Sequence, residues 1–308
     1  MNTSIKNTDP VLLIGDAGLI ATTAVCLLAA GHYLNVFTSN AVEFEEFLNH
    51  HLKAQDKTGA YQNKLVVNTK LTAHHNCKLV IAITHENAVD KQHLLKKLIP
   101  VIADDTVVAI NTESIPLDTL QAGFDNPERL IGLNWTEPVH TSLFLEVIST
   151  DVNGDIPKEI VALANSFWGK DAYIVKNDGI RSRLISAMAR EASYLVDNGY
   201  ASVDDIDRAC RNDAGYYLPF SGNCRYMDLM GTYAYGMVMK DLNSDLSKDT
   251  QLPQFMEQVL ADGGMGMENN KGFYNYTTDE VAKWKEITEK FSYQIQEIIE
   301  KYPFNYNK

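Results

Sequence analysis

Short runs of β-branched and aliphatic residues alternate with helix-length segments in the first part of the chain. These runs lie at residues 11–14, 34–37, 79–83 and 107–110. Runs of this kind, separated by segments long enough for a helix, are typical of a mostly parallel sheet with crossover helices. The pattern therefore predicts an α/β domain over residues 1–177.

After Gly179 the strand pattern fades and a helical pattern replaces it. Ser202 and Asp205 have the spacing of a helix cap, and residues 278–300 have the pattern of a last amphipathic helix. The first helix of this part is indicated by apolar residues that recur every three or four positions and stop before Gly199: Ile180, Leu184, Met188, Ala192 and Leu195. We therefore expect an all-α domain over residues 178–308.

Composition and charge narrow the possible functions. The 308 residues are 45% hydrophobic, which suffices for the cores of two domains. A net charge of −13 argues against a nucleic-acid or membrane surface, because phosphate binding needs clustered Lys and Arg. The first ten residues lack the apolar core of a signal peptide. The cysteines show no metal or CxxC spacing, so we expect no metal and free thiols in a reducing cytoplasm: Cys26, Cys77, Cys210 and Cys224.

The first predicted strand leads into a turn, GDAGLI at residues 15–20, and then into a helix. This placement suits the first βαβ unit of a Rossmann-like dinucleotide-binding domain. Gly15 keeps the tight turn, but Ala17 and Ile20 stand where glycines would admit a pyrophosphate and allow close helix packing. Gly15, Ala17 and Gly18 are the candidate cofactor contacts. The alternative is a Rossmann-like layer that keeps its fold and binds nucleotide poorly.

Two polar features near this turn bear on the choice of nucleotide. Asp16 places a carboxylate in the turn, where it repels a pyrophosphate unless the side chain points to solvent. The second strand ends in Thr38, Ser39 and Asn40, without the acid that grips an adenosine ribose. No Lys or Arg follows closely to receive a 2′-phosphate. Thr38 is the candidate contact here, and NAD(H) is favoured over NADP(H).

Residues 130–150, LIGLNWTEPVHTSLFLEVIST, resemble the block that carries the catalytic histidine of 3-hydroxyacyl-CoA dehydrogenases. That family writes the block approximately as GLHFFNPVxxMxLVEV. Gly132, Trp135, Pro138 and Glu146 keep the frame, but the position of the histidine holds Asn134. An asparagine takes up no proton at neutral pH, so the general-base chemistry of the family cannot run through it unchanged.

Three further residues match the surroundings of the nicotinamide ring in that family. The segment LVIAITHEN at residues 79–87 is similar to a family segment ending in Val-Glu-Asn, and it retains Glu86. Lys91 stands at the position of a cofactor-contacting lysine, and Asn111 opens a segment similar to the family's Asn-Thr-Ser-Ser. The resemblance implies bound NAD(H) with Glu86, Lys91 and Asn111 around its ring.

The acid–base positions have changed more. The family uses a His oriented by a Glu, with a Ser and an Asn that hold the 3-oxygen of the substrate. Here the Glu is kept as Glu146, while the other three positions hold Asn134, Glu113 and Ser182. Glu113 is a candidate base, and the alternative is a solvent-facing turn residue.

His140 is the second candidate base. It follows Asn134 by six positions, an offset that keeps the same face of a regular strand. Pro138 lies between the two residues and disfavours a regular strand. The alternative for His140 is a packing or surface residue.

The C-terminal part carries the resemblance further. GMGMENNKGFYNY at residues 264–276 is close to the family's GxLGxKxGKGFYxY, and residues 207–231 are similar to its GxGxPxGPFELLDxxG, with Arg225 in place of the acid. The resemblance covers residues 10–276. It implies a helical domain that completes the substrate cleft and forms a homodimer.

Two functional classes remain open. The first is an NAD-dependent oxidoreductase acting on a 3-hydroxy acid, its CoA thioester or a related 3-hydroxy compound, with an acid–base set rebuilt from Glu113, Glu146 and His140. The second is a lapsed enzyme that serves as a binding or structural protein. The nicotinamide-end residues favour the first class, and the altered glycine turn and missing base favour the second.

Overall fold

The computed structural model describes residues 5–302 except residues 56 and 58. It divides into two compact units, Met1–Ser182 and Arg183–Lys308. Within the described residues the first unit is α/β and the second is helical, which confirms the predicted fold class.

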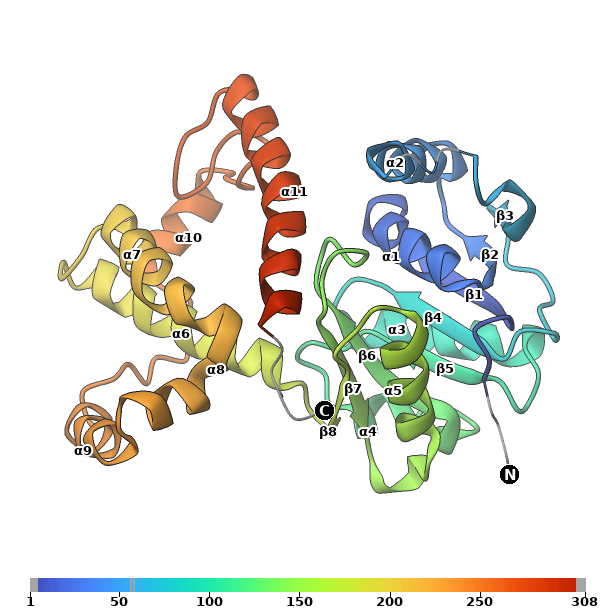
Figure 1. Ribbon diagram of the computed structural model, residues 1–308, viewed down its shortest axis with the longest axis horizontal. Coiled ribbons are helices and arrows are strands. Elements are labelled where there is room, and N and C mark those ends of the chain that lie inside the picture. The colour runs from blue at the N-terminus through green and yellow to red at the C-terminus, as the bar shows by residue number, and fades with distance from the viewer. Residues whose placement is uncertain (1–4, 56, 58, 303–308) are drawn as a thin grey trace. The chain divides into compact units, whose positions relative to one another are not determined.

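An eight-stranded sheet forms the centre of the N-terminal unit (Figure 1). The strands are β1 (Pro10–Gly15), β2 (Tyr33–Phe37), β3 (Leu65–Asn68), β4 (Leu79–Ile83), β5 (Val107–Ile110), β6 (Leu130–Trp135), β7 (Leu145–Ser149) and β8 (Tyr173–Lys176). Their order is β3-β2-β1-β4-β5-β6-β7-β8, with β6 and β7 antiparallel and the other neighbours parallel. Since β1 pairs with both β2 and β4, the strand order reverses at β1, the point at which Rossmann sheets bind dinucleotides.

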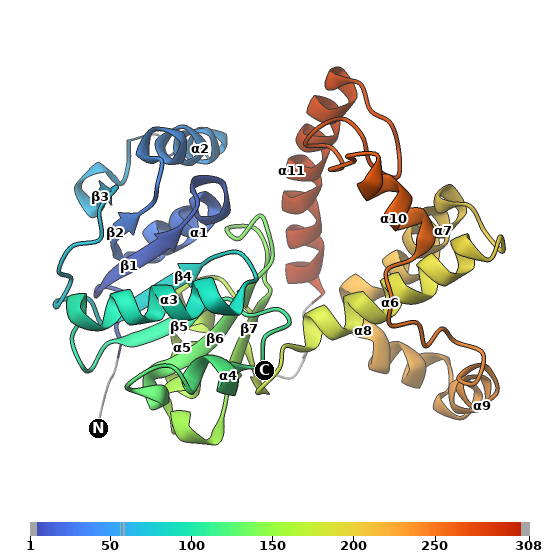
Figure 2. The same cartoon turned by 180° about the vertical axis from the view of Figure 1, so that it is seen from behind.

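Helices cover both faces of this sheet (Figure 2). They are α1 (Ala17–Ala30), α2 (Ala41–Ala54), α3 (Ala88–Leu98), α4 (Leu117–Gln121) and α5 (Ile156–Phe167). Alternate residues of β1 serve the two cores, as expected for a strand buried on both sides. Val11 and Leu13 belong to the core that also contains residues of α1, α2 and α5, whereas Leu12 and Ile14 belong to the core with α3 and α4.

Helices form the second unit, and α6 crosses the boundary between the units. They are α6 (Ile180–Asp197), α7 (Val203–Ala209), a π-helical turn (Cys210–Ala214), α8 (Gly215–Met230), α9 (Thr232–Leu242), α10 (Gln254–Ala261) and α11 (Thr278–Lys301). The predicted cap is present, because Ser202 and Asp205 each accept the backbone N–H of the other at 3.2 Å. Gly222 interrupts α8 with a φ of 64°, a conformation that favours glycine.

Cys26, Cys77, Cys210 and Cys224 are all free thiols. In the described part of the chain, no helix combines the length and the apolar character needed to span a membrane.

Candidate cofactor-binding and active site

The turns that follow β1, β4 and β5, together with the end of β6, lie at one edge of the sheet because these strands are parallel. This edge collects the candidate residues of the first unit that the sequence placed after each strand: Gly15, Ala17, Gly18, Glu86, Lys91, Asn111, Glu113 and Asn134. A dinucleotide site in an open α/β sheet lies outside such carboxyl ends.

The glycine turn closes tightly although two of its glycines are replaced. A Cβ atom on Gly15 would lie 2.4 Å from the carbonyl oxygen of Ile83 and 2.5 Å from Cγ2 of Ile20, so residue 15 tolerates no side chain. Ile20 itself is completely buried, and Ala17 is buried as well. Ile20 therefore fills the space between helix and sheet that a third glycine would leave for close packing.

Asp16 points away from the turn toward solvent. Its carboxylate lies 3.1 Å from Nε2 of His85, and both side chains are more than half exposed. The side chain makes no capping hydrogen bond to α1. An exposed carboxylate in water repels a nearby phosphate weakly, so Asp16 leaves room for a pyrophosphate beside the helix N-terminus.

A cavity of about 450 Å³ opens beside this turn, within the size range of small-ligand sites. Gly15, Thr38 and Ser39 line one wall, and α3 contributes His93 and Lys97 to another. Thr38 is 1% exposed, and among the described residues its hydroxyl has no hydrogen-bond partner. A ribose or phosphate oxygen would satisfy that hydroxyl, so the residues present fit the adenosine half of NAD.

Glu86 organises the turn after β5. Its Oε1 accepts the backbone N–H groups of Glu113, Ser114 and Ile115 at 2.9, 2.8 and 3.0 Å. Burial raises the pKa of Glu86, but these hydrogen bonds and nearby Lys91 outweigh burial and hold the pKa below its ordinary value. The carboxylate thus fixes the backbone that carries Glu113.

Lys91 is completely buried and joins the ends of β4 and β5. Its Nζ lies 3.3 Å from Oε2 of Glu86 and donates to Thr84 Oγ1 at 3.1 Å. It also donates to Asn111 at two sites, the backbone oxygen at 2.8 Å and Oδ1 at 3.0 Å. Burial lowers the pKa of Lys91, and Glu86 opposes this shift. Lys91 and Asn111 therefore form the floor of the predicted nicotinamide end.

Asn134 is completely buried, and its amide is fully engaged. Its Oδ1 accepts the backbone N–H of Thr112 at 2.9 Å, and its Nδ2 donates to the Thr112 carbonyl at 2.8 Å and to Glu146 Oε2 at 3.2 Å. The side-chain amide thus pairs with both the N–H and the C=O of Thr112, as the backbone of a neighbouring strand would. It serves as a cross-link and has no hydrogen left to offer a substrate.

Glu146 is also completely buried, directly opposite Asn134 on β7. Its Oε1 accepts the Tyr173 hydroxyl at 3.2 Å and the backbone N–H groups of Ile180 and Arg181 at 2.9 and 3.3 Å. The pKa of Tyr173 is raised by burial and by Glu146. A Cβ on Gly179 would lie 2.5 Å from Oε2 of Glu146, so this approach requires glycine.

Glu113 is the exposed acid of this group. Its carboxylate accepts two hydrogen bonds from Nη1 of Arg181, at 3.1 and 3.2 Å, and one from the Ser182 hydroxyl. The side chains of Glu113 and Arg181 are 32% and 30% exposed. The structure therefore brings Glu113 and Ser182 together, as the predicted site requires, and adds Arg181.

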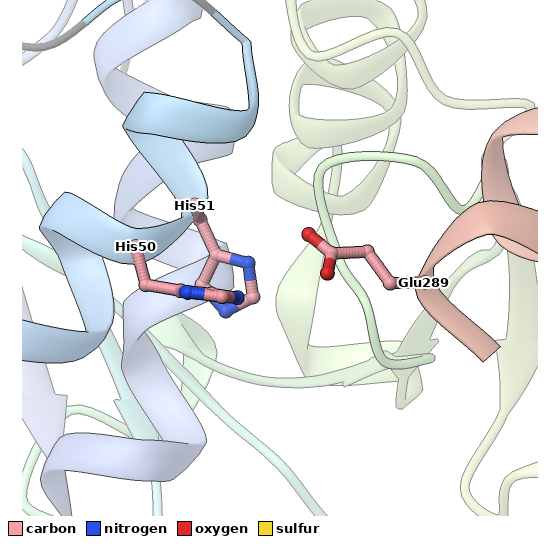
Figure 3. A group of neighbouring side chains, drawn as sticks. All are labelled: His50, His51 and Glu289. Atoms are coloured by element: carbon pink, nitrogen blue, oxygen red, sulfur yellow. The ribbon is translucent and has the colours of Figure 1, made fainter. Parts of the chain in front are cut away.

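His140 lies elsewhere. Strand β6 ends at Trp135, so the regular strand that would place His140 on the face of Asn134 is absent. The His140 ring lies 5.2 Å from the ring of His51 at the end of α2, where His50 and His51 stand next to each other (Figure 3). Burial, His51 and nearby lysines lower the pKa of His140 to about 4.

Sequence reasoning missed the residues that complete these contacts. Arg181 directly precedes the predicted Ser182, yet no pattern marks it as a partner of Glu113. Tyr173 lies on β8, a strand the sequence did not predict. A signal for the cavity wall was present, because Asp90, His93, Leu94 and Lys97 recur at helical spacing and share one face of α3.

The fold is that of Rossmann-type, dinucleotide-dependent enzymes, with a cavity at the strand switch and an accessible acid on the turn after β5. Comparison with known families supplies the particular group. Residues 31–178 match "3-hydroxyacyl-CoA dehydrogenase, NAD binding domain", and residues 180–276 match "3-hydroxyacyl-CoA dehydrogenase, C-terminal domain". The chain therefore belongs to the 3-hydroxyacyl-CoA dehydrogenase family, a family of NAD-dependent oxidoreductases. The matched range begins after the altered glycine turn.

Individual relatives agree with this family. The 5-formyl-3-hydroxy-2-methylpyridine 4-carboxylate 5-dehydrogenase of Mesorhizobium japonicum is 30% identical over 208 residues, which are 66% of this chain and 66% of that protein. A probable 3-hydroxybutyryl-CoA dehydrogenase of Bacillus subtilis is 27% identical over 70% of this chain and 75% of its own length.

Solved structures share the fold. A crystal structure of a 5-formyl-3-hydroxy-2-methylpyridine 4-carboxylic acid 5-dehydrogenase, described as an NAD⁺-dependent dismutase, superposes with a TM-score of 0.84 at 22% identity. It covers 95% of this chain and 99% of that one. A 3-hydroxybutyryl-CoA dehydrogenase from Ralstonia eutropha gives a TM-score of 0.68 at 21% identity, over 88% of this chain and 99% of that one.

Proposed function

We propose that this oxidoreductase interconverts a 3-hydroxy acid, or its CoA thioester, and the corresponding 3-oxo compound, with Glu113 as the proton acceptor. The arrangement around Glu113 carries the proposal. Its backbone is fixed by Glu86, its carboxylate is accessible, and the Ser182 hydroxyl reaches it. An acid held on a rigid turn and open to solvent has the position that a general base needs.

In the oxidative direction the substrate hydroxyl gives its proton to the Glu113 carboxylate. As the C=O bond forms, the carbinol C–H bond must give up its electron pair as hydride, and NAD⁺, when bound, would supply the hydride acceptor. Ser182 is placed to hold the 3-oxygen while the proton moves. Asn134 and Glu146 act as positioning residues, because they fix the backbone of Thr112 and the start of α6.

NAD binding requires residues from two parts of the sheet edge. Gly15, Ala17, Gly18 and Thr38 would hold the pyrophosphate and adenosine. Glu86, Lys91 and Asn111 would shape the floor under the nicotinamide ring without being consumed in the reaction. His140 is disfavoured as a base, because its ring packs against His51 outside the regular strand.

A lapsed enzyme is the second candidate, and the saturation of Asn134 favours it. The residue at the family's catalytic position has become a buried cross-link with no free hydrogen. The relative from Mesorhizobium japonicum acts on a pyridine carboxylate rather than a CoA thioester, which favours a changed substrate over lost activity.

Cofactor titration separates the two candidates. NADH fluorescence and the thermal midpoint of the protein are followed together as NADH is added. A hundredfold excess over the dissociation constant should stabilise the fold by about 2.7 kcal/mol. Absence of any shift at millimolar NADH would exclude the oxidoreductase. With binding established, Glu113→Gln should lower turnover by roughly 10²–10⁴-fold, the usual contribution of general-base catalysis.

We also propose a cytoplasmic homodimer. The free thiols support a reducing compartment. Leu184 and Met188 on α6 are 68% and 53% exposed, which supports an interface on that helix. Sedimentation of the purified chain measures its mass in solution, and a monomer at micromolar concentration would contradict the dimer.

A further inference from the structure

We propose that Arg181 is the anchor for a carboxylate group on the substrate, and that its engagement releases Glu113 for proton transfer. The inference rests on the proposed function, because it names the substrate class of the same site. It selects the free 3-hydroxy acid over the CoA thioester, which has no carboxylate at the acyl carbon.

The first observation concerns the hydrogen bonds of the guanidinium. Both of its side-chain contacts to Glu113 come from Nη1, at 3.1 and 3.2 Å. An arginine presents five N–H donors in a planar fork, so a second edge of Arg181 is available to an anion. A carboxylate of the substrate can bind that edge with two parallel hydrogen bonds.

The second observation is that Arg181 is held in place while its charged end faces the site. Its backbone N–H donates to the buried Glu146 at 3.3 Å, and its guanidinium lies 6.0 Å from the ring of Phe144. The side chain is 30% exposed, which makes the charge partly desolvated and still accessible. Anchored, partly buried arginines are the residues best suited to recognise carboxylates.

In the free enzyme the Glu113 carboxylate already accepts three hydrogen bonds. Arg181 binds both of its oxygens, and the Ser182 hydroxyl donates to Oε2. About one acceptor site of the carboxylate therefore remains for a substrate hydroxyl. A substrate carboxylate that competes for Arg181 weakens those contacts, and the same binding event then prepares the base.

The balance of charge fits one anion. Glu113 and Arg181 neutralise each other, and nearby Glu86 and Lys91 form a second ion pair. Binding a carboxylate at Arg181 therefore adds one negative charge to these two ion pairs. Proton transfer to Glu113 then removes the charge of that residue, which compensates for the added anion during the reaction.

The test compares substrates that share a 3-oxo group and differ in the carboxylate. Acetoacetate, methyl acetoacetate and acetoacetyl-CoA are reduced with NADH, and absorbance at 340 nm gives KM and kcat. Wild type should prefer acetoacetate. Arg181→Met should raise the KM for acetoacetate by roughly 10–100-fold, as expected for a lost charged hydrogen-bonded pair, and should change the KM for methyl acetoacetate, which has no carboxylate, far less. A change in kcat that follows from the loss of the Arg181–Glu113 contact should be common to both substrates. Lys176→Met, which removes an exposed lysine on β8, is the matched charge control.

A binding arm works without turnover. Malonate, which carries carboxylates and cannot be reduced, should raise the thermal midpoint of wild type, whereas neutral malonamide should not. Arg181→Met should abolish the malonate shift, and Glu113→Gln should increase it severalfold, because Arg181 is then freed from its partner. A residue with a purely structural role would not produce opposite changes in these two variants.

The outcomes keep the two proposals apart. If wild type does not bind NADH, the proposed oxidoreductase function is overturned. A rise in the thermal midpoint with malonate that depends on Arg181 would still support the carboxylate anchor. An equal fall in acetoacetyl-CoA and acetoacetate turnover in Arg181→Met overturns the anchor and leaves the oxidoreductase standing. A malonate shift that persists in Arg181→Met also overturns the anchor.

Discussion

The two ends of the proposed cofactor site are built in opposite ways. At the nicotinamide end, Lys91, Asn134 and Glu146 are completely buried and every polar group named above has a hydrogen-bond partner. At the adenosine end, Asp16 and His85 are mostly exposed, and the buried hydroxyl of Thr38 has no partner among the described residues. At the nicotinamide end the buried polar groups are paired within the protein, whereas at the adenosine end the Thr38 hydroxyl could be paired by a ligand.

This difference separates residues that stabilise the fold from residues that we propose bind the cofactor. Buried carboxylates at the nicotinamide end bind backbone N–H groups, so their loss should reduce stability. Substitutions at the adenosine end should change affinity for the nucleotide and leave stability nearly unchanged.

Glu146→Ala should destabilise the protein by about 3–4 kcal/mol. The substitution leaves Asn134 and Tyr173 without their acceptor and removes the anion at the start of α6. Urea denaturation measures the change. The exposed acid Glu128 gives the control, since Glu128→Ala should stay within about 0.5 kcal/mol. A loss below about 1 kcal/mol at Glu146 would show that the buried network contributes little to folding.

Lys91→Met should destabilise by about 2 kcal/mol, because Glu86 loses its buried cation and the ends of β4 and β5 lose a shared donor. Lys96→Met on the exposed face of α3 is the matched control. If Lys91 mainly contacted the cofactor, the variant would keep its stability and lose NADH affinity, and the proposed division of roles would fail.

Ser39→Asp should tighten NADH binding about tenfold, which corresponds to 1.4 kcal/mol, because a carboxylate after β2 can accept the ribose hydroxyls. NADPH binding should weaken, since the same acid repels a 2′-phosphate. Residue 39 is exposed and lines the cavity, so the unfolding free energy should not change. Fluorescence titration of Ser39→Asp and Ser39→Asn gives the comparison, and identical NADH affinities would place the ribose elsewhere.

Mild acid should weaken the α2 flank of the adenosine end before the nicotinamide end. The pKa of His140 is about 4, below its ordinary 6.5. Between pH 6.5 and 4 the imidazole is therefore protonated in the unfolded chain and neutral in the folded one, and the free energy of unfolding falls as the pH falls. Glu86 has a pKa below its ordinary 4.5, so its contribution is lost only in stronger acid.

Thermal midpoints at pH 6.5 and 4.5 test this order. Between the two values, wild type should lose roughly 2–4 °C more than His140→Gln, since the variant lacks the titrating imidazole beside His51. Parallel curves for the two proteins would mean that other groups, such as buried His32, dominate the acid sensitivity.

The sequence predicted the elements with strong periodicity. The strands at β1, β2, β4 and β5 and the helix from Ile180 are where the apolar patterns indicated them. Strands β3 and β8 were missed because they are short and only partly buried, so they lack the continuous apolar run of a central strand.

The site was predictable in its members and not in its contacts. Glu113 and Ser182 stand 69 positions apart in the chain, and the resemblance named both. Arg181 could not be inferred, because a lone arginine at a helix start has no distinguishing pattern. The burial of Asn134 was equally hidden, since it depends on hydrogen bonds to the backbone of Thr112 that no side-chain pattern records.

Glu146 explains how a chain can change its catalytic position and keep its architecture. The carboxylate accepts the first N–H groups of α6, where an anion stabilises a helix, and Gly179 leaves the space for it. Asn134 binds the other oxygen, Oε2, so Glu146 makes this contact with α6 while an asparagine stands at the position of the family's histidine. The needs of the fold therefore account for a buried glutamate at this position, and its presence alone is no marker of activity.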